Sequence, residues 1–495
     1  MALTRRSFVK GATILPFAVW LAEEGWAQPM PVMTRWDARS AQGIANLKIY
    51  ASAVTKMRNA ALFPEKNPRS WTFQWYTHQV KGNIQQNVQN KANAIQQIYG
   101  APASVWKSLA LDMWNTCQAH LGQPENYFLP WHRMYVLYIE QIVRKVTAQP
   151  SFTLPYWNYS VTGPDHGVIP PQFRMPNDAT FGSLYVSKRN AGVNNGTPID
   201  QNSPPGSNPL SLDALKQCKY GFTSNAVQGF NQTLDFGLHG NVHVLTGNSQ
   251  NMGSVPWAAY DPIFYLHHCN IDRLWASWNA DPNRKNPNDA AFTSKTFVFA
   301  NGDGNKVTPS IGSVLNIATL GYKYDHLEPL TPAHCPATPA LAAATVKVVA
   351  SKVPRIPLGP GPVRASLEAP AGASTASVPL GTRIERLNPE HHLYLVVNDL
   401  KTEGTPGVVY HLYLELPPHS GSAAGQYYVG SINFFAAEHR HEGQPISVSF
   451  DITDLAKKLK AQGHLAAKAE LTIAPAGTPA SEAKPTVGEV ALHEA

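Results

Sequence analysis

The sequence predicts a mainly α-helical N-terminal domain, built as a four-helix bundle with long loops, followed by a C-terminal antiparallel β-sandwich. The 495 residues exceed what one hydrophobic core usually supports. Apolar residues recur with a helical period in the first part of the chain and with a period of two near its end. A stretch rich in Pro, Ala and Gly separates them, so the predicted parts are a helical domain over 28–330, a linker over 331–375 and a sandwich over 376–495.

The N-terminus resembles a twin-arginine export signal. Residues 4–10 read TRRSFVK and precede an apolar stretch over 11–22, and Gly25-Trp26-Ala27 suits a cleavage site. The alternative is a membrane anchor, but an apolar run of about 12 residues is shorter than the ~20 that span a bilayer. We therefore expect a signal peptide over 1–27 and an exported protein, periplasmic or secreted.

Helices are predicted from their apolar period and their end signals. Pro130 opens one helix, and Asp261 with Pro262 forms an N-cap and first turn for another. Residues 161–224 are rich in Pro, Gly, Asn and Ser, which indicates long ordered loops. The predicted helices cover 38–61, 131–146, 228–246 and 261–278, with helical or mixed segments over 83–99 and 104–115.

Beyond the linker, alternating β-branched and aromatic residues predict strands and hence the sandwich. One short helix is expected over 454–460. The predicted strands cover 392–397, 409–416, 427–435, 446–452, 468–473 and 487–492.

The composition is that of an ordinary globular protein, with 43% hydrophobic and 15% charged residues. The net charge of +7 comes without a basic run, so we expect no nucleic-acid partner. No stretch beyond the N-terminus is long and apolar enough to span a membrane. The cysteines have no tight spacing, which argues against a disulfide scaffold and a cysteine zinc site: Cys117, Cys218, Cys269 and Cys335.

One group of histidines falls on the last two predicted helices of the N-terminal domain. His239 and His243 are four residues apart, so both face one side of a helix and suit one metal ion. The next helix carries His267 and His268, either of which can complete the set.

A second group consists of His132, at the first turn of its predicted helix, with His120 and His78 upstream. Sites made only of imidazoles suit copper or zinc, and neither group offers the carboxylates of di-iron bundles or the cysteines of structural zinc. Spacing alone leaves a second interpretation open, in which these histidines are unrelated core or surface residues.

The residues around these histidines resemble a known superfamily. FLPWHRMY over 128–135 and DPIFYLHHCNIDRLW over 261–275 are similar to the two copper-binding signatures of the tyrosinase, catechol oxidase and haemocyanin superfamily. NPRS over 67–70 resembles the stretch before the first ligand in polyphenol oxidases, and GYKYD over 321–325 resembles the motif that ends their catalytic domain. The C-terminal strands also resemble the β-sandwich of polyphenol oxidases. The resemblance, to a bacterial tyrosinase or polyphenol oxidase, therefore covers nearly the whole chain.

The resemblance implies two copper ions in a binuclear type-3 site. The family ligand lies seven residues after Asp261, which selects His268, and His267 should point about 100° away. Asp272 either orients a ligand imidazole or forms an ordinary ion pair. The implied ligands are His78, His120 and His132 for one ion, and His239, His243 and His268 for the other.

The implied activity is oxidation of small phenols by O₂, with o-diphenols converted to o-quinones and O₂ to water. Efficient monophenol hydroxylases of the family carry Glu and Asn where this chain has Asp235 and Gly240, and Asn241 is turned about 100° away. We therefore expect weaker monophenol hydroxylation, with Phe264 lining the site. The alternatives are a true tyrosinase with strong monophenolase activity, a haemocyanin-like O₂-binding protein and, more distantly, a dizinc hydrolase.

Two further features follow from the resemblance. Many relatives join a cysteine to the second histidine by a thioether, but Cys117 lies one residue further from His120 than in those relatives, so an ordinary buried thiol is the favoured state. The C-terminal domain often shields the copper site in this family. His439 and His441 either contact copper or face solvent, and solvent is favoured.

Overall fold

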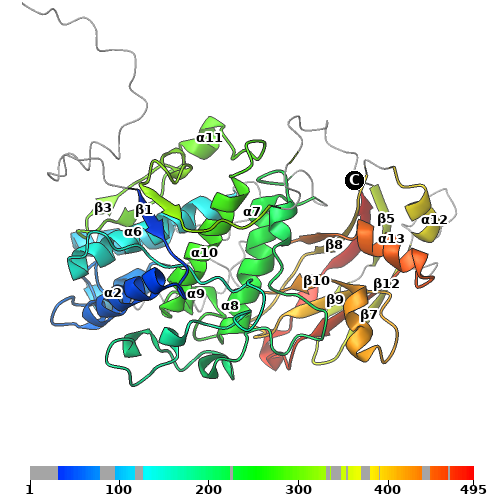
Figure 1. The fold of residues 1–495 in the computed structure, drawn as a ribbon, viewed down its shortest axis with the longest axis horizontal. Helices are drawn as coiled ribbons and strands as arrows, with labels where there is room; N and C mark the ends of the chain where they lie inside the picture. The colour runs from blue at the N-terminus through cyan, green and yellow to red at the C-terminus, as the bar shows by residue number, and fades with distance from the viewer. Residues whose placement is uncertain are drawn as a thin grey trace, which may run out of the picture.

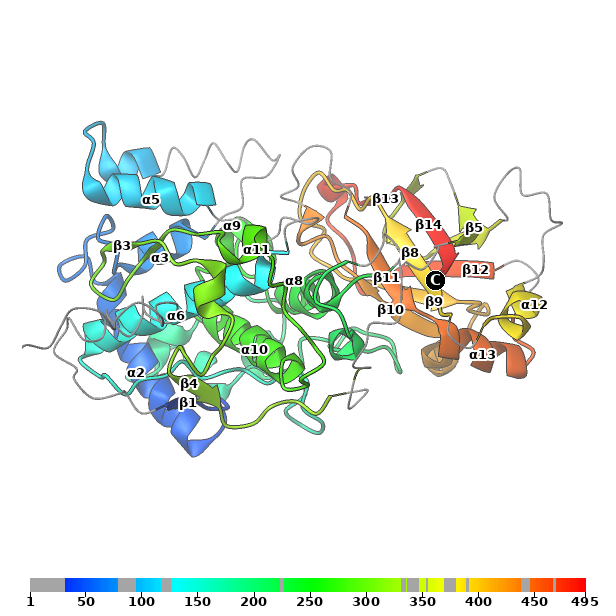
Figure 2. The ribbon, with the colours of Figure 1, turned by 90° about the horizontal axis from the view of Figure 1, so that it is seen from above.

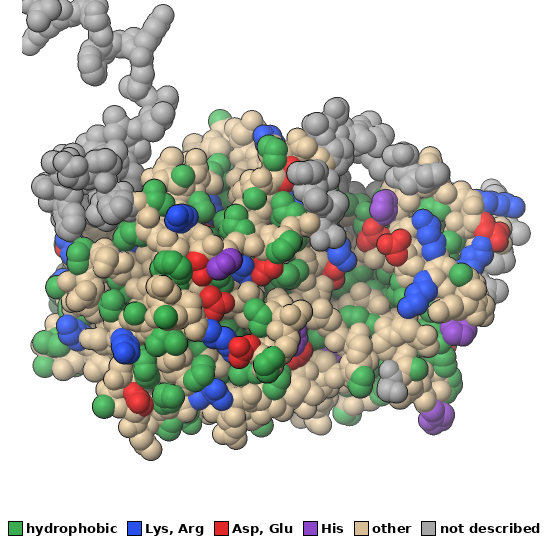
Figure 3. Space-filling view, viewed as in Figure 1, with side chains coloured by type: hydrophobic (Ala, Val, Ile, Leu, Met, Phe, Trp, Pro, Cys, Tyr) green, Lys and Arg blue, Asp and Glu red, His purple; other side chains and the backbone are tan. Residues whose placement is uncertain are grey.

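The computed structural model describes residues 32–78, 95–116, 126–222, 227–330, 335, 347–352, 355–368, 380–388, 391–437, 446–465 and 469–495. The predicted signal peptide and most of the predicted segment 83–99 lie outside these residues. Figures 1 and 2 show a helical domain and a strand-rich domain lying side by side. On the face in Figure 3, basic and acidic side chains are interspersed.

The helical domain is centred on α6 (Phe128–Thr147), which is buried along its first sixteen residues. Helices α2 (Ala41–Arg58) and α10 (Ile263–Trp278) pack against it. These helices, and α5 (Val105–Thr116), confirm the sequence predictions. The carboxylate of Asp261 accepts a hydrogen bond from the backbone N–H of Ile263 at 3.1 Å and so fixes the start of α10.

Residues 161–222 run as loops, as the sequence predicted, with four short 3₁₀ turns. Among the described helices, none has the length and apolar character that crossing a bilayer requires. The turns cover Pro171–Phe173, Gly182–Leu184, Val193–Asn195 and Asp213–Lys216.

The predicted helix over 228–246 is instead interrupted. It consists of α7 (Phe230–Thr233), a π-helical turn η5 (Leu234–His239) and α8 (Gly240–Thr246). Gly237 has φ −95° and ψ −108°, which lies outside the helical region. A hydrophobic period does not reveal such an interruption of a helical run.

The C-terminal domain contains two four-stranded sheets, and every strand pair in them is antiparallel. Side chains from both sheets share one buried apolar cluster. Helices α12 (Leu380–Glu385) and α13 (Thr453–Ala461) pack against each other beside the sheets. The first sheet has the order β10 (Tyr428–Ile432), β9 (Tyr410–Leu414), β12 (Ala469–Pro475), β7 (Val363–Leu367). The second has the order β11 (Val448–Asp451), β8 (Leu393–Asn398), β14 (Glu489–Glu494), β5 (Lys347–Lys352).

The linker predicted over 331–375 includes residues that form strands of the C-terminal domain. It contains β5, β7 and the short strand β6 (Ile356–Pro357), which pairs with β13 (Thr486–Val487). β5 and β7 are both edge strands of their sheets. Edge strands are short and tolerate nearby proline, so the composition of this segment concealed them.

One disulfide joins Cys218 to Cys335, with a Cα–Cα distance of 5.6 Å. The sequence argument against a disulfide scaffold did not predict this single bridge, because its partners are 117 residues apart in the chain. The N–H of Cys335 also donates to Asp281 at 2.7 Å, so residue 335 is held to the helical domain. Cys269 is a buried free thiol.

A buried ion-pair network surrounds Asp272. Strand β1 (Met33–Arg35) pairs in parallel with β4 (Tyr322–Tyr324) and brings Arg35 to the carboxylate at 3.0 Å, opposite Arg133 at 2.5 Å. Two tyrosine hydroxyls also donate to it, from Tyr322 at 2.7 Å and Tyr324 at 2.6 Å. Of the two roles considered for Asp272, these contacts support the ion pair, since no contact with an imidazole is present among them.

Burial by itself would raise the pKa of Asp272, but Arg133 and Arg35 outweigh it and hold this pKa below its usual value. The folded-state pKa is thus lower than the unfolded value of about 3.9. The resulting stabilisation is full at neutral pH and is lost as the pH falls below about 4.

Asp272→Ala is expected to lower the free energy of unfolding by about 3–5 kcal/mol, because it leaves two buried guanidinium groups without their shared carboxylate. Thermal unfolding at pH 7 measures the loss. The matched control is Asp213→Ala, whose partner Lys216 is exposed and whose loss should cost less than about 1 kcal/mol. Equal effects of the two substitutions would contradict this account.

The two domains exchange apolar side chains across their interface. Phe236 of η5 is buried in the core of the C-terminal domain, whereas Val409 and Phe435 of that domain are buried in the helical core. The hydroxyls of Ser207 and Tyr413 lie 2.9 Å apart across the same interface.

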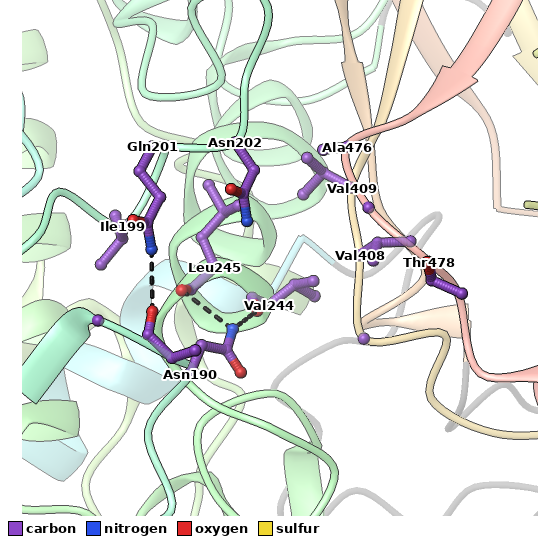
Figure 4. Close-up of a pocket in the computed structure, with 14 residues that line it drawn as sticks. Asn190, Ile199, Gln201, Asn202, Val244, Leu245, Val408, Val409, Ala476 and Thr478 are labelled. Atoms are coloured by element: carbon purple, nitrogen blue, oxygen red, sulfur yellow. Dashed lines mark hydrogen bonds between the residues drawn. The ribbon is translucent and has the colours of Figure 1, made fainter.

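A cavity of about 460 Å³ also lies between the domains. Figure 4 shows Asn190 and Gln201 on the helical side facing Val409 and Thr478 on the other. No histidine lines this cavity, so it is separate from the predicted metal ligands.

Candidate metal centre

Four histidines form a buried cluster between α8 and α10. Each of His239, His243, His267 and His268 offers one ring nitrogen, and these four atoms lie within 4.8 Å of one another. The Nε2 atoms of His243 and His268 are 3.3 Å apart. His239 at the end of η5, His243 on α8 and the doublet on α10 thus face a common point. The spacing predicted this for the pair His239 and His243.

His267 belongs to this cluster, although the sequence predicted that its side chain would point away from the metal. Its ring stacks on that of His239 with centroids 5.3 Å apart and lies 4.7 Å from that of His243. Neither ring nitrogen has a hydrogen-bond partner in the described part of the chain. The adjacent pair His267-His268 was the sequence signal for this fourth imidazole. Adjacent residues lie about 100° apart on a helix, and both of these side chains are directed toward α8.

The other predicted ligands adjoin this cluster. His132 lies on α6, and His78 follows α3 (Trp71–Tyr76), with 5.7 Å between their ring centroids. The ring of His132 stacks on that of His268 at 4.0 Å. The structure therefore brings together five of the six predicted ligands, while His120 and Cys117 lie outside the described residues.

Hydrogen bonds fix the tautomers of four of these imidazoles. Backbone carbonyl oxygens accept but never donate, so an Nδ1 bonded to one carries the proton, and a neutral ring then has its lone pair on Nε2. The four Nδ1 donors and their carbonyl acceptors are His78 to Val255 at 3.1 Å, His132 to Phe128 at 3.0 Å, His239 to Asp235 at 3.2 Å and His243 to Met252 at 2.8 Å.

Burial and the neighbouring imidazoles lower the pKa of His268 well below its usual value, and burial with His239 does the same for His267. Neutral, buried and pre-oriented imidazole nitrogens are the donors that copper prefers, and backbone carbonyls commonly orient such ligands. The residues present therefore fit a metal centre made of histidines.

Two of the predicted substrate-tuning residues contact the imidazoles. The ring of Phe264 lies 4.2 Å from that of His268 and 4.8 Å from that of His78, so it stands between the two groups of histidines. The Asp235 carboxylate lies 3.1 Å from Nδ1 of His239.

Gly240 and Asn241 lie instead at the domain interface. The Asn241 amide donates to the carbonyl of Pro209 at 2.9 Å and its Oδ1 accepts from Asn433 at 2.9 Å. A Cβ on Gly240 would lie only 2.7 Å from the Asn433 amide nitrogen.

Phe435 of the C-terminal domain covers the cluster. Its ring stacks on that of His243 with centroids 4.1 Å apart and an interplanar angle of 11°, and it lies 5.6 Å from that of His239. Only 2% of the residue is exposed. Phe435 was not predicted from the sequence. The residues considered for contact with copper, His439 and His441, lie outside the described residues.

Comparisons with known proteins give a match for each domain. Residues 68–281 match the family model described as the common central domain of tyrosinase, and residues 346–495 match a domain of unknown function, DUF7868. The tyrosinase HcTyr1 of Hahella sp. (strain CCB-MM4) is 29% identical over 90% of this chain and 96% of its own length. Chloroplastic catechol oxidase B of Solanum tuberosum is 30% identical, but the match spans only 40% of this chain and 37% of that enzyme.

The solved structure of latent apple tyrosinase is 20% identical, with a TM-score of 0.59 over 94% of this chain and 98% of that one, and so shares the fold. The match to the central domain of tyrosinase falls on the segment that carries the buried histidines. The chain belongs to the tyrosinase and polyphenol oxidase family of copper oxidoreductases, whose members hold a binuclear copper site.

Proposed function

We propose that this enzyme is a type-3 copper polyphenol oxidase that converts o-diphenols to o-quinones while O₂ is reduced to water. The observation that carries the proposal is the set of buried imidazoles on α6, η5, α8 and α10. Backbone carbonyls hold the Nδ1–H groups of His132, His239 and His243. One copper is assigned to His78, His120 and His132, and the other to His239, His243 and His268.

When bound, the copper pair supplies the two-electron exchange between phenol and O₂. The protein's own contribution is to orient the imidazoles, exclude water and dock the ring. Phe264 forms an apolar wall between the two groups of histidines. Burial lowers the pKa of His267 and His268 and so favours their neutral form, which suits metal binding.

The C-terminal domain is proposed to act as a shield. Phe435 places an aromatic ring flat on the imidazole of His243, where the ring of a phenol would stack. While the domains stay docked, the Phe435 ring and a phenolic substrate compete for the face of the His243 imidazole. The docked chain is therefore a low-activity form.

Diphenol oxidation is proposed to outweigh monophenol hydroxylation. The Asp235 carboxylate is directed to Nδ1 of His239, and Gly240 offers no side chain that could hold a water for deprotonating a phenol. The space beside Gly240 is filled by the Asn433 amide, so the docked domain leaves no room for an asparagine at this position.

The initial rate on 4-methylcatechol should exceed that on 4-methylphenol by about 10²-fold, which is what loss of a positioned base costs. The ratio is measured on one copper-loaded preparation of the full chain, so that the fraction of undocked chains cancels. A monophenol rate equal to or above the catechol rate would refute the preference. Quinone accumulation over many turnovers on the catechol would exclude a haemocyanin-like O₂ carrier.

We also propose that the protein is exported by the twin-arginine route before it acts. The Cys218–Cys335 disulfide supports this, because disulfides persist mainly in oxidising compartments. Sequencing the N-terminus of the mature protein tests the predicted cleavage after Ala27.

A further inference from the structure

Asn433, in the loop that follows β10, makes hydrogen bonds to the segment that carries His239. Its amide nitrogen donates to the carbonyl of Phe236 at 2.8 Å and to Oδ1 of Asn241 at 2.9 Å, and it lies 3.4 Å from the carbonyl oxygen of Gly237. Its own Oδ1 accepts from the N–H of Phe435 at 3.1 Å. One side chain of the C-terminal domain thus contacts the π-helical turn and the covering phenylalanine.

The hydrogen bond to Phe236 replaces one that the helix lacks. In a regular α-helix, the carbonyl of Phe236 would accept from the N–H of Gly240, four residues later. Here the N–H of Gly240 donates to the carbonyls of Asp235 and Gly237 instead. A buried carbonyl without a donor costs free energy, so the Asn433 amide stabilises this particular backbone path.

Two more features fit the turn to the C-terminal domain. The side chain of Phe236 is buried in the core of that domain. Gly240 has the helical φ of −63° and ψ of −35°, so its backbone would accept any residue, yet only glycine leaves room for the Asn433 amide. The glycine is therefore matched to Asn433 rather than to the helix.

We propose that Asn433 is a positioning residue for the second copper ion, so that the C-terminal domain shapes the metal centre as well as covering it. His239 lies two residues after the non-helical Gly237, and the backbone path through the turn sets where its imidazole stands. This inference rests on the proposed ligand set and concerns the position of a metal ligand, whereas shielding is the role of Phe435.

The test compares copper release from full-length, copper-loaded Asn433→Ala and wild-type protein to an excess of a chromogenic chelator. Loss of a partner that orients a ligand typically weakens metal binding by about 10–100-fold. One of the two coppers should therefore leave about tenfold faster or more, while release of the other is unchanged. Ser207→Ala is the matched control, because it removes the hydrogen bond to Tyr413 at the same interface but away from the turn.

If Asn433→Ala does not fold, Gly240→Ala is a second way to remove the contact between Asn433 and the turn. Its methyl group would push the Asn433 amide away from the turn, so it should also speed the release of one copper, but should add nothing in an Asn433→Ala background. Unchanged release in Asn433→Ala, or equal acceleration by Ser207→Ala, would overturn the inference. A wild-type chain that binds no copper pair would instead refute the proposed function.

Discussion

Phe435→Ala should raise the rate of catechol oxidation by the full-length, copper-loaded chain by about 10–100-fold. The substitution removes the ring that stacks on His243 and opens the place where a phenol would dock. It also removes a buried aromatic side chain from the contact between the domains, which typically costs about 3–5 kcal/mol and shifts the chain toward the undocked form. Initial rates at a catechol concentration well below KM measure the effect.

Phe435→Leu is the control for this result, because it keeps an apolar side chain over the site and should raise the rate much less. Gly425→Val tests docking from a distance. Gly425 meets Gly206 across the interface so closely that a Cβ would lie 2.6 Å from the Cα of Gly206. A bulky residue there should separate the domains and raise the rate, although the substituted side chain itself does not contact the histidines. If neither Phe435→Ala nor Gly425→Val raises the catechol oxidation rate, shielding is excluded.

Proteolysis between the domains also tests shielding, without substitutions. The structure limits the residues at which a cut would separate the domains. The predicted linker over 331–375 includes β5, β6 and β7, so a cut in its second half would break the sheets. Residue 335 is held to the helical domain by its disulfide and by Asp281. A cut within 336–346 is therefore the one expected to separate the domains while leaving both intact.

The imidazole cluster was predictable because its signals are local in sequence. His239 and His243 are four residues apart, at the end of η5 and on α8, and the doublet lies on α10, so helical spacing predicts which of their side chains share a direction. The helices around them followed from an apolar period for the same reason. The exception is the turn at Gly237, where one glycine and a hydrogen bond from a distant domain decide the backbone path.

The cover over the site could not be predicted. Phe435 lies in a different domain from His243, which it contacts. Nothing in a strand-like sequence distinguishes a ring that covers a site from one that packs in a core. The same holds for Asn433, which reads as an ordinary loop residue. Their roles exist only in the contact between two domains, and each domain's pattern describes that domain alone.

His268→Ala should reduce bound copper from two ions to one per chain and lower the oxidation rate by about 10³-fold or more, since the reaction needs both ions. His268 is chosen because its Nε2 lies 3.3 Å from that of His243 and its ring stacks on that of His132, which places it between the two groups. Copper per chain and the catechol rate are measured on the same samples.

His267→Phe is the matched control, because phenylalanine keeps a ring against His239 but offers no nitrogen. If His267 is only a neighbour of the ligands, this variant keeps two coppers and a rate within about tenfold of wild type. If His267→Phe loses one copper and His268→Ala keeps both, then His267 is the ligand and His268 is the neighbour. Loss in both would mean that the second ion needs four imidazoles, a result the spacing of His239, His243, His267 and His268 permits because all four nitrogens lie within 4.8 Å.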